Sequence, residues 1–465
     1  MSGIFGVVSK NKNCMNQLFY AGDYHSHLGT QFGGIALSGE KIIRRIHNIS
    51  SSQFKSKLLE EFSSLEGNKG IGAISYEEQP IYVKSRFGDF CLVTNGWINN
   101  WKALTEELFS KNFSFSEISD SRINICELVS KLILQKKSLT EGIEYMYSKI
   151  KGSISLLILT KKGIYASRDK YGLSPLIIGK SREGFAVVSE TAAFPNLDFK
   201  VVKELLPEEI VFIKQSGLQQ KKKGNENNLK ICAFSWVYTG FPASCYQGKN
   251  VEKVRENCGK LLARADQVKP DLAAGVPDSG TAHAIGYALG KGVPFRRPLV
   301  KYTPGYGRSY LPSAQSVRNL VAKMKLIPIK EIIKGQKIVL CEDSIVRGTQ
   351  LKNYTLTKLW GSKAKEVHVR VACPPLLFPC IFNYSTRTKK ELIARQVIKS
   401  IEGKNKKDIS RYIDDKTPKY DKMIAQIAKD LGVTTLKYQK IADMVSAIGL
   451  PKDKLCLYCW TGKFK

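Results

Sequence analysis

Apolar residues in the first half of the chain fall into short runs separated by turns. Turn signals such as KKG at 161–163 and REG at 182–184 bound several of these runs, which is typical of β-strands. We expect strands at residues 4–8, 153–160, 164–166, 176–178, 186–189 and 210–213. Residues 121–135 instead repeat their apolar positions at the helical period. The first half is therefore predicted to be α+β with a large amount of sheet.

The second half alternates between the two periods. Strands are expected at 271–276, 299–302, 337–341 and 367–372, and helices at 251–265, 282–289, 313–324 and 351–359. Such alternation predicts a parallel sheet covered by helices on both faces. A mostly helical, polar tail is expected over 389–440. The polar stretch KKKGNENN at 221–228 is interpreted as a linker, which divides the chain into domains 1–228 and 229–465.

Length and composition support a folded protein of two domains. The chain has 465 residues, of which 43% are hydrophobic and 25% charged, as in ordinary globular proteins. No apolar run approaches the roughly 20 residues of a membrane helix. Lys10 and Lys12 interrupt the only early apolar run, so we expect no signal peptide and a cytoplasmic location without membrane attachment.

The charge and the cysteines suggest what the protein binds. A formal net charge of +32 fits either nucleic-acid binding or an anionic, phosphorylated substrate on a Lys-rich background. The Lys residues are scattered, which favours the second interpretation and makes nucleic acid the weaker hypothesis. The 11 cysteines of a chain without a signal peptide are not expected to form a disulfide framework. They suggest buried thiols and one metal or cluster site.

The segment IVLCEDSIVRGTQ at 338–350 carries the clearest chemistry. A buried strand ends in the carboxylates Glu342 and Asp343, and a loop of small residues leads from them into a helix. Loop amides and hydroxyls at a helix N-terminus can bind a phosphate. Gly348 permits close backbone approach, and the carboxylate pair can hold ribose hydroxyls or a divalent cation. The segment therefore predicts a site for a phosphorylated sugar.

This segment resembles the phosphoribosyl pyrophosphate (PRPP) signature of type I phosphoribosyltransferases. GVPDSG at 275–280 looks like the pyrophosphate loop of the amidophosphoribosyltransferases, and KYTPGYGRSY at 301–310 stands where that family has a flexible loop. The resemblance implies that magnesium is held by Ser279, Glu342 and Asp343. It implies PRPP contacts from Asp278, Ser279, Gly280, Lys301, Arg308, Glu342, Asp343, Ser344, Ile345, Val346, Arg347, Gly348 and Thr349.

The first half resembles the glutaminase domain of the same family, a class II glutamine amidotransferase of N-terminal-nucleophile type. Residues 168–179 match its RD..G..PL..G pattern. The implied fold is an α+β sandwich followed by an α/β type I phosphoribosyltransferase domain with a parallel sheet. Asn95 and Gly96 match the oxyanion pair of the family, and Asp120 matches its contact to the substrate amine.

The residues that would bind and cleave glutamine depart from the family. Ser2 stands at the position of the catalytic cysteine, and a serine hydroxyl is a poorer nucleophile than a thiol near neutral pH. Other N-terminal-nucleophile hydrolases do use serine, so this exchange alone is not decisive. Leu28 and Ser75 replace two arginines of the family, one of which grips the glutamine carboxylate. We therefore expect a degenerate glutaminase domain.

Four cysteines stand where the iron–sulfur branch of the family ligates a [4Fe–4S] cluster. They are Cys232, Cys380, Cys456 and Cys459. Four thiolates suit such a cluster. Zinc is an alternative occupant, because it also accepts four thiolates, and four cysteines without any bound metal are the remaining alternative. The cysteines at positions 14, 91, 126, 245, 258 and 341 are interpreted as ordinary buried thiols.

These features predict an enzyme that forms 5-phosphoribosylamine from PRPP in de novo purine biosynthesis, with ammonia rather than glutamine as the nitrogen source. Ammonia would come from solution or from a supplying partner protein. The family resemblance implies a homodimer or homotetramer. A PRPP-sensing regulatory protein without catalysis is the alternative hypothesis, and an altered amine acceptor is a further one.

Overall fold

The computed structural model describes residues 2–50, 52–119, 122–302, 325–383, 386, 388–403 and 408–464. Two compact units are present. The first comprises Met1–Cys232 and Ile381–Ser385, and the second comprises Ala233–Cys380 and Thr386–Lys465. The boundary expected after residue 228 lies shortly before Cys232, and the sequence did not indicate the short return to the first unit.

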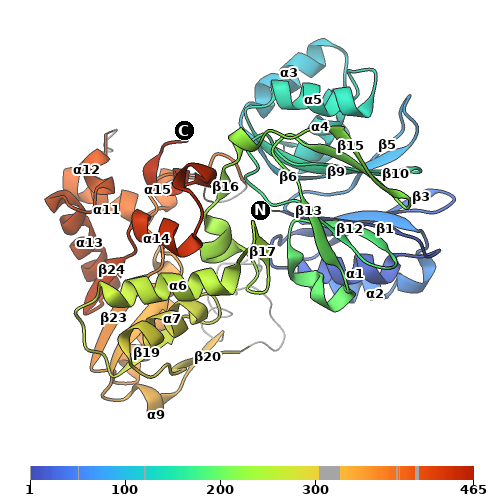
Figure 1. The fold of residues 1–465 in the computed structure, drawn as a ribbon. Coiled ribbons are helices and arrows are strands. Elements are labelled where there is room, and N and C mark those ends of the chain that lie inside the picture. The colour runs from blue at the N-terminus through green and yellow to red at the C-terminus, as the bar shows by residue number, and fades with distance from the viewer. Residues whose placement is uncertain are drawn as a thin grey trace. The chain divides into compact units, whose positions relative to one another are not determined.

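The first unit contains two antiparallel sheets (Figure 1). The seven-stranded sheet has the order β13-β11-β12-β1-β4-β2-β3. Its strands are β1 (Gly3–Ser9), β2 (Phe32–Ser38), β3 (Ile42–Asn48), β4 (Lys69–Ser75), β11 (Ile177–Lys180), β12 (Gly184–Val188) and β13 (Lys200–Glu204). The six-stranded sheet has the order β15-β14-β10-β9-β6-β5. Its strands are β5 (Ile81–Val83), β6 (Phe90–Ile98), β9 (Gly152–Thr160), β10 (Gly163–Ser167), β14 (Ile210–Lys214) and β15 (Gly217–Lys222).

Helices cover the outer faces of these sheets, so the first unit is a four-layered sandwich. One hydrophobic core joins the two sheets and includes Ile4, Val93 and Leu157. A second core joins the six-stranded sheet to the helices α3 (Trp101–Ser110), α4 (Ile125–Ile133) and α5 (Leu139–Lys149). The helix α1 (Met15–Tyr24) packs on β1 and β4, and α2 (Phe54–Leu59) packs on α1. The short strands β7 (Ile118–Ser119) and β8 (Arg122–Ile123) pair beside α4.

The second unit is built on a four-stranded parallel sheet of order β19-β22-β23-β24. Its strands are β19 (Leu272–Gly275), β22 (Lys337–Glu342), β23 (Glu366–Val371) and β24 (Thr435–Tyr438). Ile338, Val339 and Leu340 are fully buried, as expected of a strand covered on both faces. The carboxyl ends of β19 and β22 lie side by side, which places the loops that follow them at one edge of the sheet.

Helices and short strands complete the second unit (Figure 1). The helices are α6 (Val251–Arg264), α7 (Thr281–Lys291), α9 (Lys330–Ile333), α10 (Thr357–Gly361), α11 (Ile393–Glu402), α12 (Ser410–Ile413), α13 (Pro418–Leu431), α14 (Ile441–Ile448) and α15 (Tyr458–Thr461). The remaining strands of the chain are β16 (Ile231–Cys232), β17 (Cys245–Tyr246), β18 (Lys249–Asn250), β20 (Leu299–Lys301), β21 (Leu326–Pro328) and β25 (Leu455–Cys456). No helix in the described residues is long and apolar enough to cross a membrane.

Several local predictions differ in part from the structure. The strand expected at 299–302 is present as β20, but it pairs antiparallel with β21 and does not join the four-stranded parallel sheet. The tail expected to be mostly helical also contains β24, the fourth strand of that sheet. The predicted linker begins inside β15, which hydrogen-bonds to β14. The helix predicted at 121–135 begins only at Ile125, because the Asn124 side chain accepts hydrogen bonds from the first turn. The helix expected at 313–324 lies outside the described residues.

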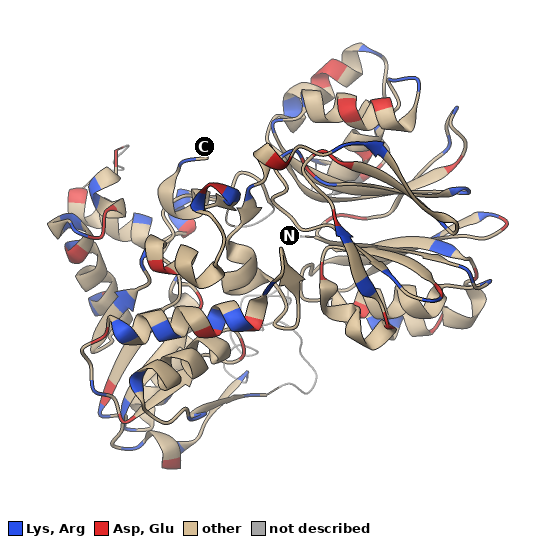
Figure 2. Ribbon diagram, viewed as in Figure 1, with Lys and Arg blue, Asp and Glu red and all other residues tan. Residues whose placement is uncertain are grey.

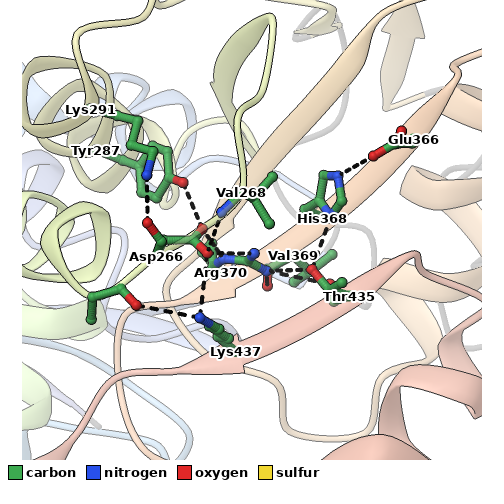
Figure 3. A network of polar contacts seen from close by, with 11 residues as sticks. Asp266, Val268, Tyr287, Lys291, Glu366, His368, Val369, Arg370, Thr435 and Lys437 are labelled. Atoms are coloured by element: carbon green, nitrogen blue, oxygen red, sulfur yellow. Dashed lines mark hydrogen bonds and ion pairs between the residues drawn. The ribbon is translucent and has the colours of Figure 1, made fainter.

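A buried ion pair ties the parallel sheet to the helices that cover it (Figure 3). Arg370 on β23 donates from Nε to Asp266 Oδ2 at 2.6 Å and from Nη2 to Oδ1 at 3.0 Å, and neither side chain is exposed. The Tyr287 hydroxyl of α7 donates to the same carboxylate at 2.6 Å. Burial opposes ionisation of Asp266, but these hydrogen bonds outweigh it and hold the pKa of the carboxyl well below its usual range.

We expect Asp266→Asn to lower the free energy of unfolding by about 3–5 kcal/mol, because it leaves the Arg370 guanidinium buried without its counter-charge. Since the pKa of Asp266 is lower in the folded state, its contribution is present above the ordinary pKa of 3.8 and is lost as the pH falls below it. Urea unfolding at pH 7 and pH 3.5 measures both effects. The matched control is Asp271→Asn, whose exposed carboxylate accepts a backbone hydrogen bond from Lys337. Equal losses in the two variants would contradict the prediction.

Candidate active site

Two adjacent carboxylates stand at the carboxyl end of β22. Glu342 is 8% exposed and Asp343 is 3% exposed. The Ser279 hydroxyl and the Asp343 main-chain N–H donate to Glu342 Oε1 at 3.5 and 3.2 Å, and the Ser344 hydroxyl donates to Asp343. Burial raises the pKa of Glu342 well above its usual value, and the charge of Asp343 adds to this effect. Burial likewise raises the pKa of Asp343. A cation or sugar hydroxyls would stabilise the charged pair.

The loop after β19 lies against this pair. Gly280 ends the loop and precedes α7, and a Cβ at this position would stand 2.3 Å from the Cys341 carbonyl oxygen. Only glycine therefore lets the loop approach β22 this closely. Asp278 is mostly exposed and accepts a hydrogen bond at 2.8 Å from Lys301 Nζ, at the end of β20. The structure thus brings 278–280, Lys301, Glu342 and Asp343 together. Arg308 lies outside the described residues.

The loop from Ser344 to Thr349 runs from the carboxylates to a helical segment. Ile345 is buried, and Val346 accepts a backbone hydrogen bond from Ile393 of α11 at 2.8 Å. Gly348 has a φ of +75°, a left-handed conformation that favours glycine. A π-helical turn, Leu351–Leu356, continues into α10.

The surface beside this loop is open and hollowed. Arg347 forms an ion pair with Glu391 and lies at the rim of an open hollow of about 390 Å³. Gly348 and Thr349 also line the hollow, together with α11 and α13 residues. Lys and Arg residues are spread over many elements of both units (Figure 2). This distribution suits an anionic substrate better than one continuous nucleic-acid surface.

In the first unit, the main-chain nitrogen of Ser2 donates to Asn95 Oδ1 at 3.2 Å. Asn95 and Gly96 belong to β6, and Gly96 has a φ of +136°. A Cβ at Gly96 would stand 1.8 Å from the Ser153 carbonyl oxygen of β9, so the position accepts only glycine. The structure therefore places the candidate nucleophile beside the candidate oxyanion pair. Asp120 lies outside the described residues.

The positions of the two replaced arginines are buried and uncharged. Leu28 is 8% exposed, and its Cδ1 lies 2.9 Å from where a Cβ of Gly3 would stand. Ser75 is fully buried, and its hydroxyl donates to the Glu77 carbonyl oxygen. A charged pair that the sequence analysis missed lies close by. It joins Glu77 to Arg122, which are far apart in the chain and carry no recognisable motif.

The segments that carry three of the four candidate cluster cysteines, Cys380, Cys456 and Cys459, contact each other in the second unit. The main-chain nitrogens of Leu377 and Phe378 both donate to the Cys459 carbonyl at 3.0 Å, which brings the segment before Cys380 to α15. The charges of Cys459, Cys380 and Cys456 all contribute to a raised pKa of Tyr458, after the larger effect of burial. Ala233, the residue after Cys232, donates to the Cys456 carbonyl at 3.3 Å.

The described residues contain no group of three or more His, Cys, Asp or Glu side chains already gathered for metal binding. The four candidate cysteines nevertheless suit an iron–sulfur cluster chemically, because all four carry thiols. The charges of three of them contribute to the raised pKa of Tyr458. Of the remaining cysteines, Cys245 is exposed, so its interpretation as a buried thiol was wrong. The others expected to be buried are buried, at positions 14, 91, 126, 258 and 341.

The chain is similar over nearly its full length to known proteins. A family model described as a glutamine amidotransferase domain matches residues 70–196. An amidophosphoribosyltransferase from Methanocaldococcus jannaschii is 32% identical over 100% of this chain and 97% of its own. The enzyme of that name from Bacillus subtilis is 30% identical over 99% of this chain and 93% of its own.

A solved structure of glutamine phosphoribosylpyrophosphate amidotransferase from B. subtilis, complexed with ADP and GMP, superposes with a TM-score of 0.84. It is 28% identical and covers 99% of this chain and 97% of its own. The predicted fold class is thereby confirmed: a class II glutamine amidotransferase domain is followed by a phosphoribosyltransferase domain with a parallel sheet.

Proposed function

The chain belongs to the amidophosphoribosyltransferase family, and from this premise we propose that it forms 5-phosphoribosylamine from PRPP and ammonia, without hydrolysing glutamine. The product is the amine intermediate of purine nucleotide biosynthesis. The observation that carries the proposal is the buried pair Glu342 and Asp343, which stands beside the 275–280 loop at the carboxyl edge of the parallel sheet.

Phosphoribosyl transfer requires mainly that the protein hold the two fragments of PRPP in the right positions. Phosphoribosyl transfer breaks the bond from the anomeric carbon to pyrophosphate through an oxocarbenium-like state, so the protein must hold both fragments and exclude water. The exposed Asp278 and the loop amides, with the Lys301 ammonium beside them, face the pyrophosphate in this assignment. Glu342 and Asp343 hold the ribose hydroxyls, and the 344–349 loop receives the 5-phosphate. Ammonia then attacks the anomeric carbon and pyrophosphate leaves.

Magnesium fits the same residues. Ser279, Glu342 and Asp343 present hard oxygen donors, the ligands that Mg²⁺ prefers. Burial raises the pKa of both carboxyls, and a cation bound beside them would favour their charged forms. When bound, the ion would neutralise charge on the pyrophosphate leaving group.

The loss of glutamine hydrolysis rests on the first unit. Ser2 lies beside Asn95, but a hydroxyl replaces the thiol. Leu28 and Ser75 leave no cation where the family arginines stand, and an uncharged side chain cannot replace their charge-assisted contact with a carboxylate. Asn95 and Gly96, which match the oxyanion pair of the family, are retained.

We also assign Cys232, Cys380, Cys456 and Cys459 to a [4Fe–4S] cluster, with zinc as the competing occupant. The backbone contacts of Cys459 with Leu377 and Phe378, which lie shortly before Cys380 in the chain, support this assignment. The cluster would contribute to folding rather than to phosphoribosyl transfer, as metal sites commonly do when their ligands lie far apart in the chain.

The test is pyrophosphate release from PRPP with ammonium and with glutamine side by side. We expect turnover with ammonium and none above background with glutamine. Ser2→Cys is expected to restore no glutamine-dependent turnover, since the arginines are also absent. Comparable rates with the two nitrogen sources, or recovery in Ser2→Cys, would contradict the loss of glutaminase activity. Binding of PRPP without any turnover would favour the sensor hypothesis.

A further inference from the structure

Lys301 of the second unit forms an ion pair with an exposed carboxylate. Its Nζ donates a hydrogen bond to Oδ2 of Asp278 at 2.8 Å. The Asp278 side chain is 71% exposed, whereas that of Lys301 is 26% exposed. Lys301 lies at the end of β20, and Asp278 lies in the loop between β19 and α7, next to Ser279, whose hydroxyl donates to Glu342. The pair therefore joins two separate elements beside the candidate PRPP site.

The main chain on both sides of this ion pair is held by other contacts. The Thr281 N–H, at the start of α7, donates to the Asp278 carbonyl at 3.1 Å. The Val276 N–H of the same loop donates to a carbonyl of β22 at 3.0 Å. Lys301 pairs with Leu326 in the β20–β21 ladder. The ion pair can therefore open by rotation of the two side chains, without a change in the backbone.

Pyrophosphate would compete with this carboxylate for the same ammonium. In the proposed reaction Lys301 faces the pyrophosphate group of PRPP, and two anions on one lysine repel each other. An exposed ion pair contributes only about 0.2–1 kcal/mol to stability, because water solvates both charges. A pyrophosphate group carries several negative charges, so it can displace a single exposed carboxylate.

We propose that Asp278 is a displaceable counter-ion of Lys301, which neutralises the lysine in the empty site and gives way to pyrophosphate when PRPP binds. Opening the ion pair costs free energy, which lowers the affinity of the site for pyrophosphate in PRPP and in the product alike. Re-forming the pair then favours release of the pyrophosphate product. This inference rests on the proposed function, which places the pyrophosphate at Lys301.

The test removes the competing charge and measures binding directly. Titration calorimetry of the full chain with inorganic pyrophosphate and Mg²⁺ is expected to show about three- to tenfold tighter binding by Asp278→Asn than by the wild type. The gain should shrink as the ionic strength is raised, since both charges are exposed to solvent. In a Lys301→Met background, Asp278→Asn is expected to bring no gain. The matched control is Asp271→Asn, which changes the net charge equally at the opposite end of β19 and should leave the affinity unchanged.

Steady-state kinetics give a second measurement of the same effect. Asp278→Asn is expected to lower the KM for PRPP without raising kcat, because the ion pair opposes substrate and product binding equally. Urea midpoints equal to that of the wild type would show that the variant is folded, as expected for a side chain that is mostly exposed.

Each outcome supports or overturns the inference. Unchanged or weaker pyrophosphate binding by Asp278→Asn would overturn it, and weaker binding would assign the carboxylate to the ligand or its magnesium instead. Equal gains in the Lys301→Met background or in the Asp271 control would reduce the effect to net charge and overturn it as well. The expected gain in pyrophosphate affinity without any turnover of PRPP and ammonium would count against the proposed reaction alone. A chain that binds neither PRPP nor pyrophosphate in any variant would refute both.

Discussion

Replacing Asp343 by asparagine is expected to slow pyrophosphate release from PRPP by about 10²- to 10³-fold, the cost typical of removing one electrostatic group from a reaction centre. The carboxylate is 3% exposed and lies beside Glu342 at the edge of the parallel sheet. Asparagine has nearly the same shape as aspartate, but it lacks the negative charge that would hold magnesium or the ribose hydroxyls. Steady-state rates with ammonium, over a range of Mg²⁺ concentrations, measure the loss.

The fold is expected to survive this change. Burial raises the pKa of both carboxyls, because it disfavours their charged forms. Replacing one carboxylate by a neutral amide removes part of this cost to the free energy of folding. Urea midpoints of Asp343→Asn should therefore equal or exceed that of the wild type. Asp271→Asn, at the opposite end of β19, serves as the control and should leave the rate unchanged. An Asp343→Asn enzyme with normal rate and PRPP affinity would refute the site assignment.

The parallel sheet and its loops could be predicted because their signals are local. A run such as Ile338–Leu340, followed at once by two carboxylates and a glycine-containing loop, fixes both the strand and the place of its site. The strand β24 was missed because it is short and lies within a polar, helical tail. Its pairing with β23 depends on a partner more than sixty residues away in the chain, and no local pattern encodes that.

The same distinction separates the site residues that were found from those that were not. Asn95 and Gly96 could be identified because they are adjacent and only glycine fits the second position. Glu77 and Arg122 meet through contacts made only after folding, and in the sequence each is an ordinary charged residue. The exposed position of Cys245 was likewise missed, since cysteine is usually buried and its surroundings give no contrary signal.

The purified protein, prepared without oxygen, is expected to be brown and to contain about four iron atoms per chain, the number of one [4Fe–4S] cluster. Leu377 and Phe378, shortly before Cys380, hydrogen-bond to the Cys459 carbonyl, which brings together two segments that are distant in the chain. A cluster held by Cys380, Cys456, Cys459 and Cys232 would tie the C-terminal segment to the two segments that carry Cys232 and Cys380. Iron analysis and the visible absorption spectrum measure this directly.

Cys459→Ser is expected to lose the iron and the colour, and to loosen the C-terminal segment, because a hydroxyl is a poor ligand for iron–sulfur clusters. Limited proteolysis should then cleave this segment first, as ligand loss removes the folding energy that metal binding supplies. Cys245→Ser removes an exposed thiol outside the set and should change neither the iron content nor the cleavage pattern. Zinc in place of iron would move the assignment to a tetrathiolate zinc site. A colourless, metal-free protein that resists proteolysis as well as its Cys459→Ser variant does would show that these thiols bind no metal.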